Sequence, residues 1–163
     1  METMNHAGGP AAAQKHYVKL ALMIALMFIA MFALMYAMVD RFDNVYVNLN
    51  QLYMAGVMTG AMVLIELAVM GGMYPNKKAN AAILAVSAVV LVACWFGIRE
   101  QSAIGDRQFL RSMIPHHAGA ILMCEEAPIR DQRIRGLCAG ILSSQQDEIR
   151  QMEALLEADL RAE

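Results

Sequence analysis

The chain has 163 residues, which is room for about one domain and a small appendage. Hydrophobic residues make up 58% of it and charged residues 17%, and the mean hydropathy is +0.41, so it is too apolar for an ordinary soluble domain. The net charge of -2 argues against a nucleic-acid partner. A membrane protein is therefore expected, with lipid as the solvent of its apolar segments.

Three apolar segments follow a short N-terminal tail. Each is about 20 residues long, the length that an α-helix needs to cross the ~30 Å hydrocarbon core of a bilayer. Most of the Arg, Asp and Glu residues come after the third segment. The sequence therefore predicts an all-α protein with a tail at residues 1–16, a three-helix transmembrane region at 17–99 with spans at 20–39, 52–74 and 79–98, and a water-exposed helical domain at 103–163.

Lysines mark one side of the predicted membrane region. Lys15 and Lys19 precede the first span, and Lys77 and Lys78 separate the second from the third. Cytoplasmic flanks are enriched in Lys and Arg. We therefore expect a cytoplasmic N-terminus and, after three crossings, a periplasmic C-terminal domain on the cytoplasmic (inner) membrane of a bacterium.

Methionines recur every four residues in the first two spans, a spacing that keeps side chains on one ridge of a helix. The ridges comprise Met23, Met27, Met31 and Met35 in the first span, and Met54, Met58 and Met62 in the second. Such a ridge either packs against a neighbouring helix, whose close approach Gly56 and Gly60 would allow, or forms a thioether ladder for Cu(I).

Glu66 continues the second ridge at the same interval. An ionisable residue within a span is costly and marks a functional candidate. With Met58, Met62, Met27 and Met31 it would form a candidate intramembrane path for metal. The alternative is a protonated carboxyl group that hydrogen-bonds to Thr59 or Ser87 on a neighbouring helix.

The C-terminal domain reads as two helices, residues 106–126 and 132–160, joined by a turn into a hairpin. Asp106 is the N-cap candidate of the first helix. On a helical wheel, one sector of this helix contains the side chains Met113, His116, His117, Met123 and Cys124, all within the stretch "MIPHHAGAILMC". The second helix has an apolar face that includes Cys138, Gln145 and Met152.

These residues offer two imidazoles, thioethers and thiols, a set that suits Cu(I) or Ag(I) better than hard divalent ions. The alternative is that the histidines are core residues that donate to the backbone or to Gln145, with the methionines as core. Cys124 and Cys138 would form a disulfide on the oxidising side of a membrane, or act as additional soft ligands. The residues alone do not decide between these two roles.

The hairpin also resembles a known family. Asp106, Phe109, "MIPHH", Ala120, Ile121 and Met123, followed by Gln145 or Gln146, Glu148, Ile149 and Met152, are similar to domain of unknown function 305, which includes CopM-like copper-binding proteins. The resemblance covers residues 103–156. It implies a four-helix-bundle type of fold outside the cytoplasm, and binding of copper or silver by Met113, His116, His117, Met123 and Met152 in metal resistance or homeostasis.

A hairpin of about 55 residues buries little apolar surface by itself. We therefore expect self-association, most simply a homodimer in which two hairpins build a four-helix-bundle-like assembly. The leading hypothesis is a membrane-anchored protein that binds Cu(I) or Ag(I). The rivals are a metal transporter or channel component and a purely structural membrane protein. An enzyme is not expected, because no nucleophile with a positioned base is evident.

Overall fold

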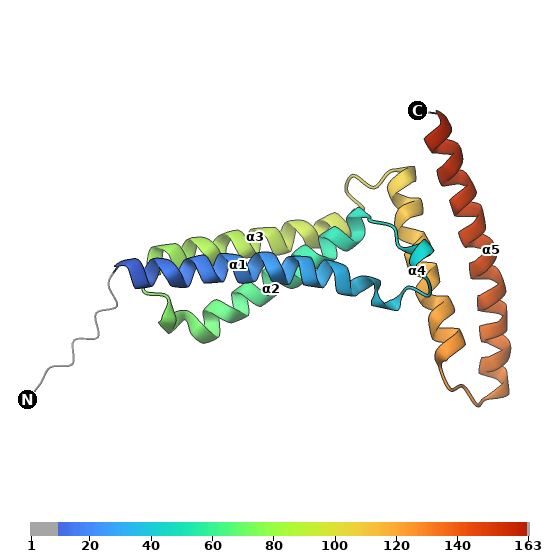
Figure 1. Ribbon diagram of the computed structural model, residues 1–163, viewed down its shortest axis with the longest axis horizontal. Helices are drawn as coiled ribbons and strands as arrows, with labels where there is room; N and C mark the ends of the chain where they lie inside the picture. The colour runs from blue at the N-terminus through green and yellow to red at the C-terminus, as the bar shows by residue number, and fades with distance from the viewer. Residues whose placement is uncertain (1–9, 163) are drawn as a thin grey trace, which may run out of the picture.

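The computed structural model describes residues 10–162, and within that range all of the regular structure is helical (Figure 1). Five α-helices are joined by loops that contain three short 3₁₀ helices, labelled η. The elements in chain order are α1 (Pro10–Leu34), η1 (Met35–Met38), η2 (Phe42–Asn44), α2 (Leu49–Met70), η3 (Gly71–Met73), α3 (Lys77–Arg99), α4 (Asp106–Glu126) and α5 (Gln132–Ala162).

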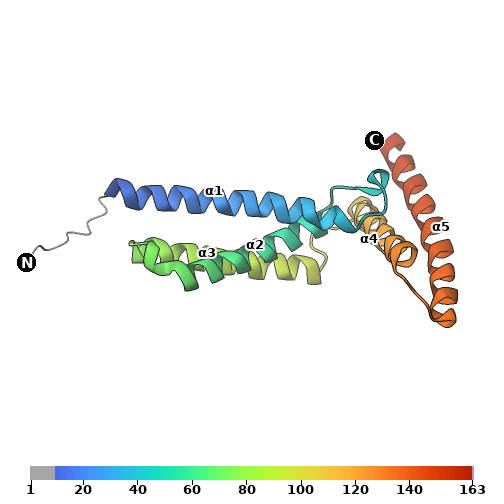
Figure 2. The same cartoon turned by 60° about the horizontal axis from the view of Figure 1, so that its bottom comes forward.

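Helices α1, α2 and α3 form an elongated unit, and α4 and α5 lie crosswise at one end of it (Figures 1 and 2). Each of the three is long and apolar enough to cross a membrane, which agrees with the three predicted spans. Helix α1 begins at Pro10, so residues 10–16 of the predicted tail are helical. The rest of the predicted tail, residues 1–9, lies outside the described residues.

Asparagine side chains fix the starts of α2 and α3. The side chain of Asn48 accepts a hydrogen bond from Gln51 N at 3.0 Å, and that of Asn76 accepts from Lys78 N and Ala79 N. Both bonds satisfy backbone donors that the first helical turn leaves free.

Helix α4 has the predicted bounds, but its N-cap residue differs from the prediction. Gly105 occupies the N-cap position, where it provides no side-chain hydrogen bond, and Asp106 is the first helical residue. The negative charge of Asp106 still lies in the first turn, where the helix dipole favours it.

Helix α2 is in contact with both α1 and α3, and its contact with α3 is the more extensive. A Cβ added at Gly60 would lie 3.0 Å from Leu91 Cβ and 3.1 Å from Ser87 O, and one at Gly56 would meet the sulfur of Cys94. A larger residue at either position would force α3 or the Cys94 side chain to shift. The neighbouring helix that the glycine pair predicts is α3.

The loop between α1 and α2 docks on the hairpin of α4 and α5. Val39 and Tyr46 of this loop pack against the hairpin core. Gly119 of α4 faces the loop so closely that an added Cβ would lie 3.4 Å from Met38 O. The membrane region and the hairpin are therefore joined by packing as well as by the chain.

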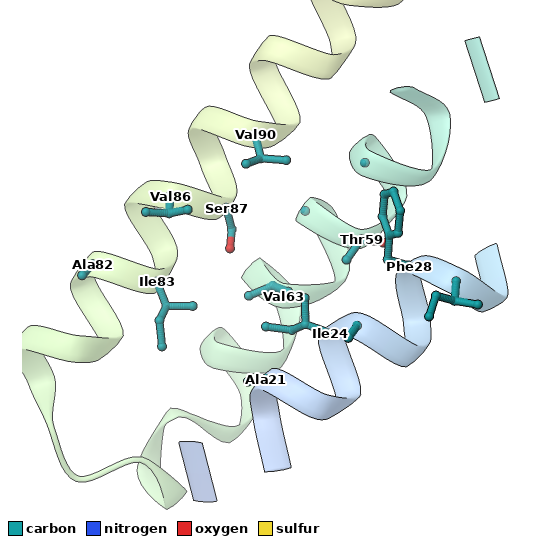
Figure 3. A pocket seen from close by; sticks show the side chains of 14 residues that line it. Ala21, Ile24, Phe28, Thr59, Val63, Ala82, Ile83, Val86, Ser87 and Val90 are labelled. Atoms are coloured by element: carbon teal, nitrogen blue, oxygen red, sulfur yellow. The ribbon is translucent and has the colours of Figure 1, made fainter. Parts of the chain in front are cut away.

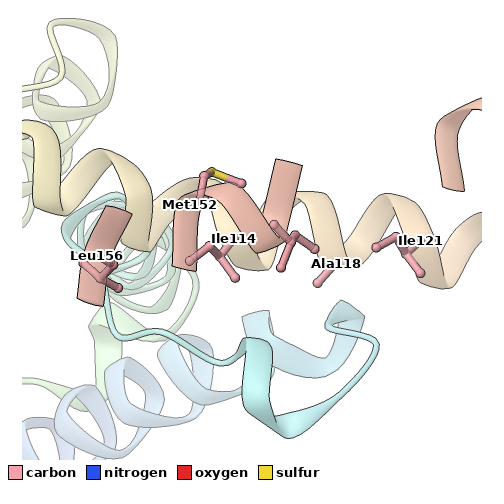
Figure 4. Close-up of a cluster of buried hydrophobic side chains, with 6 residues drawn as sticks. Ile114, Ala118, Ile121, Met152 and Leu156 are labelled. Atoms are coloured by element: carbon pink, nitrogen blue, oxygen red, sulfur yellow. The ribbon is translucent and has the colours of Figure 1, made fainter. Parts of the chain in front are cut away.

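The hairpin core lies between α4 and α5 (Figure 4). Its buried members are Ile114, Ala118, Ile121, Ile149, Met152 and Leu156. Ile114 and Ala118 are fully buried. Their side of α4 meets both α5 and the loop and forms the core. Ile114, Ala118 and Ile121 lie outside the sector that the helical wheel predicted to be buried.

The close packing at Gly60 predicts a specific destabilisation. Gly60→Leu would overpack α2 against the backbone of α3, at a typical cost of about 1–3 kcal/mol in the free energy of unfolding. Gly72→Leu is the matched control, because an added Cβ meets nothing within 4 Å there. Denaturant titration of both variants in detergent would test this, and equal effects would contradict the α2–α3 packing.

Candidate metal-binding site in the hairpin

His117 is the buried polar residue of α4, with 7% of its surface exposed. Its Nε2 atom lies 2.7 Å from Oε2 of Glu148 on α5. A carboxylate accepts hydrogen bonds, so in the neutral ring the proton is on Nε2 and the lone pair is on Nδ1. Nδ1 is buried and has no hydrogen-bond partner among the described residues. A buried nitrogen with a free lone pair is available to bind a cation.

Ser144 forms a hydrogen bond with the other oxygen of the Glu148 carboxylate. Its hydroxyl donates to Oε1 of Glu148 at 2.7 Å, one turn earlier on α5. The hydrogen bond from Ser144, and then that from His117, lower the pKa of Glu148 below its ordinary value. Glu148 is therefore a fixed, charged acceptor that orients the imidazole.

The contact between His117 and Glu148 could be predicted only in part from the sequence. The helical wheel placed His117 among the ligand candidates, and Glu148 was named only as part of the family resemblance, without a role. Ser144 was not singled out. The four-residue spacing of Ser144 and Glu148 beside the apolar face of α5 is the signal that could have identified them.

Two thioethers lie close to this pair in the seam between the helices. Met113 is one turn before His117 on α4, and Met152 is one turn after Glu148 on α5. Because the two helices are antiparallel, these positions share the next layer of the hairpin. Met152 belongs to the buried core and Met113 packs against that core. The seam therefore contains a buried imidazole and two methionines within about one turn of each other.

His116 and Met123 lie outside the seam. His116 is exposed, although its ring centroid is 6.0 Å from that of His117, and Met123 is 54% exposed. The expectation that one buried face of α4 holds all the candidate ligands is wrong for these two. The loop between α1 and α2 occupies the side of Ile114 and Ala118, which turns His116 and Met123 away from the core.

Cys124 and Cys138 form a disulfide between the end of α4 and the start of α5, with their Cα atoms 5.4 Å apart. Of the two roles that the sequence left open, the structure contains the disulfide. Its sulfurs are not thiolates, so in this state neither cysteine is a soft-metal ligand.

A site built only from His, Cys, Asp and Glu side chains is not present in the part of the chain that the structure describes. Among residues 10–162, no three His, Cys, Asp or Glu side chains come together as a metal-binding group. A site at His117 would therefore need thioether ligands, and Met113 and Met152 are of that type. Imidazole nitrogen with thioether sulfur fits Cu(I) or Ag(I) and not Mg²⁺ or Ca²⁺.

The residues of the candidate intramembrane path are placed differently from the expectation. Glu66 lies within the second candidate span, Leu49–Met73, four residues before the end of α2. Its Oε1 accepts a hydrogen bond from the hydroxyl of Tyr74 at 3.2 Å, not from Thr59 or Ser87. The 3₁₀ turn at residues 71–73 folds Tyr74 back toward Glu66 and accounts for this difference.

The path methionines do not enclose a channel with Glu66. Met58 and Met62 are 37% and 41% exposed on the outer surface of α2, and Met27 and Met31 are half-buried on α1. A groove of about 720 Å³ does run between the three helices (Figure 3), but its lining contains neither Glu66 nor a methionine. Figure 3 shows Ile24, Val63 and Ile83 around it.

Two comparisons with known proteins match the chain. Residues 97–156 match the family described as "Domain of unknown function (DUF305)". The chain is also 33% identical to "Uncharacterized protein L153" of Acanthamoeba polyphaga mimivirus over 116 residues, which is 70% of this chain and 74% of that protein. Only residues 97–163 lie between the start of the matched domain and the end of the chain, so this second similarity extends into the spanning helices. No solved structure matches the chain.

Removal of the disulfide is predicted to destabilise the hairpin. Its cysteines are 14 residues apart, and a cross-link that closes a loop of this size stabilises a protein by about 3 kcal/mol. Replacing both Cys124 and Cys138 with Ala should lower the free energy of unfolding of the hairpin by about that amount. Denaturant unfolding of the full chain, followed by circular dichroism, measures it. Cys94→Ala is the control, and a double variant as stable as this control would contradict the prediction.

Proposed function

Since this chain belongs to the DUF305 family, we propose that it is a membrane-anchored protein that binds Cu(I) or Ag(I) on the periplasmic side of a bacterial cytoplasmic membrane, in metal resistance or homeostasis. The spans would act as the anchor, and the hairpin as the binding domain. The lysines around the first and second spans support this orientation.

The observation that carries the proposal is the free Nδ1 atom of His117. In metal sites, a ligating histidine commonly donates its other N–H group to a carboxylate, which fixes the ring and strengthens the ligand. Glu148 has this relation to His117, at 2.7 Å from Nε2. A hydrogen bond that served packing alone would not explain why Nδ1 is buried without a partner.

The ligand set that we propose is Met113, His117 and Met152. Thioethers and imidazole are soft to borderline ligands, and they select Cu(I) and Ag(I) over hard cations. The set is part of the five ligands that the family resemblance implies. His116 and Met123 of that larger set are on the surface and are not assigned to this site.

Transport of metal through the spans has less support. The groove between α1, α2 and α3 is lined by apolar and hydroxyl side chains, which offer no ligand to a soft cation. Glu66 is engaged with Tyr74 near the end of α2. We therefore treat the spans as an anchor.

Titration of the full chain with Ag(I) by calorimetry tests the binding proposal. Silver requires no reductant, so the disulfide stays intact. His117→Ala should weaken binding by at least about tenfold, because changes even in the outer shell of a metal site cost about 10- to 100-fold. His116→Ala is the matched control, with an affinity within about threefold of the wild type. Equal losses in the two variants, or no binding by the wild type, would contradict the proposed site.

Glu148 provides a test of the positioning role. Glu148→Gln removes the charge that orients His117 while nearly preserving the size of the side chain. We expect Ag(I) affinity to fall by about 10- to 100-fold, with little change in the helical content measured by circular dichroism. Glu153→Gln, on the same helix, should bind as the wild type does. An unchanged affinity in Glu148→Gln would show that the carboxylate does not support a ligand.

A further inference from the structure

One surface of the hairpin remains uncovered on the side away from the loop between α1 and α2. We call it the open face. Its large apolar side chains are 51–64% exposed and comprise Phe109 and Met123 of α4 and Leu137 and Leu155 of α5. Phe109 and Leu155 line one cavity of about 360 Å³, which places these two residues on a common surface at one end of the hairpin. Exposed apolar side chains that gather on one surface can mark an interaction site.

The open face of α5 has a two-fold pattern. Leu137 and Leu155 are each nine residues from position 146, in opposite directions. Arg133 and Asp159 are each thirteen residues from the same position, and both are exposed. If a second copy of α5 lies antiparallel to the first, Leu137 of one copy therefore faces Leu155 of the other. The positive Arg133 then faces the negative Asp159.

Helix α4 has the same kind of symmetry. Phe109 and Met123 are each seven residues, about two helical turns, from His116. All three side chains are exposed. A copy of α4 laid antiparallel would place Phe109 against Met123 of the second copy, with the two His116 side chains at the centre.

A surface with this pattern is complementary to itself. In a two-fold dimer each contact occurs twice, because a residue that meets another across the axis is met by its counterpart. Leu137 would pack on Leu155 of the second copy, and Arg133 would lie opposite Asp159. The guanidinium of Arg133 is paired with Asp131 in its own chain, and its planar fork has five donors, which leaves some for a second carboxylate.

The arrangement of the spans agrees with such an axis. The hairpin lies crosswise at the end of α1, α2 and α3, with α4 beside the spans and α5 beyond it (Figures 1 and 2). A two-fold axis parallel to the spans would pair α4 with α4 and α5 with α5. It would also leave both sets of spans pointing in the same direction, into one membrane.

We propose that a second copy of this chain covers the open face in antiparallel orientation, so that two hairpins form a four-helix assembly with the His116 side chains at its axis. The apolar residues and the opposite charges at the ends of α5 favour this occupant over an unrelated protein. The proposal does not rest on metal binding. It explains why a hairpin with six buried core residues exposes four large apolar side chains on one face.

Cross-linking through a single cysteine tests the axis. His116→Cys would be made in a Cys94→Ala background and treated, as full chain in detergent with a metal chelator present, with a short bis-maleimide. The expected product is mostly covalent dimer, because the two residues face each other. Ser143→Cys, an exposed site of α5 outside the open face, should remain mostly monomer. Similar dimer yields for the two variants, or no dimer from a His116→Cys protein that a mono-maleimide labels fully, would overturn the proposal.

Charge reversal tests the register. Arg133→Glu and Asp159→Arg should each weaken self-association at least tenfold, measured by light scattering over a dilution series without metal. The double variant restores opposite charges across the axis and should return the dissociation constant to within threefold of the wild type. A double variant as weak as either single variant would overturn the register.

Failure of this proposal is separable from failure of the proposed function. A dimer that binds no Ag(I) contradicts metal binding only, and a monomer that binds Ag(I) through His117 contradicts the dimer only.

Discussion

The antiparallel seam between α4 and α5 is the interaction on which the rest of the hairpin depends. Ile114, Ala118 and Ile121 of α4 meet Ile149 and Leu156 of α5 in one buried cluster. The disulfide between Cys124 and Cys138 holds one end of this seam. The seam places His117 opposite Glu148, because the register of the two helices determines which polar groups become buried together.

The candidate site arises because the seam buries a polar side chain, the imidazole of His117. Burial of a polar group is unfavourable unless it is hydrogen-bonded. Glu148 satisfies Nε2 of His117, and Nδ1 remains without a partner. Ser144 donates a hydrogen bond to the same carboxylate, so Glu148 is held in the position from which it orients the imidazole. A soft cation bound by Met113 and Met152 would also be bound by Nδ1, which would give this nitrogen a partner.

The helices were predictable from sequence because their signals are local. Apolar runs of about 20 residues identify the three spans, and α4 has the predicted bounds, residues 106–126. The glycine pair of α2 also predicted a close neighbour, which is α3. Each of these features depends on residues that are near one another in the chain.

The parts that could not be predicted depend on contacts between distant segments. The helical wheel placed His116 and Met123 with the buried ligands, but the loop that carries Val39 and Tyr46 selects another side of α4 for the core. Nothing in the sequence of α4 indicates that this loop docks there. The partner of Glu66 was missed for a similar reason, since a 3₁₀ turn after α2 brings Tyr74 back to it.

The most direct measurement for this account is X-ray absorption spectroscopy at the silver edge, on the full chain loaded with one equivalent of Ag(I). It reports which atoms surround the metal. We predict two sulfur neighbours, from Met113 and Met152, and one nitrogen neighbour, from Nδ1 of His117. A coordination shell of oxygen and nitrogen without sulfur would contradict the thioether and imidazole site.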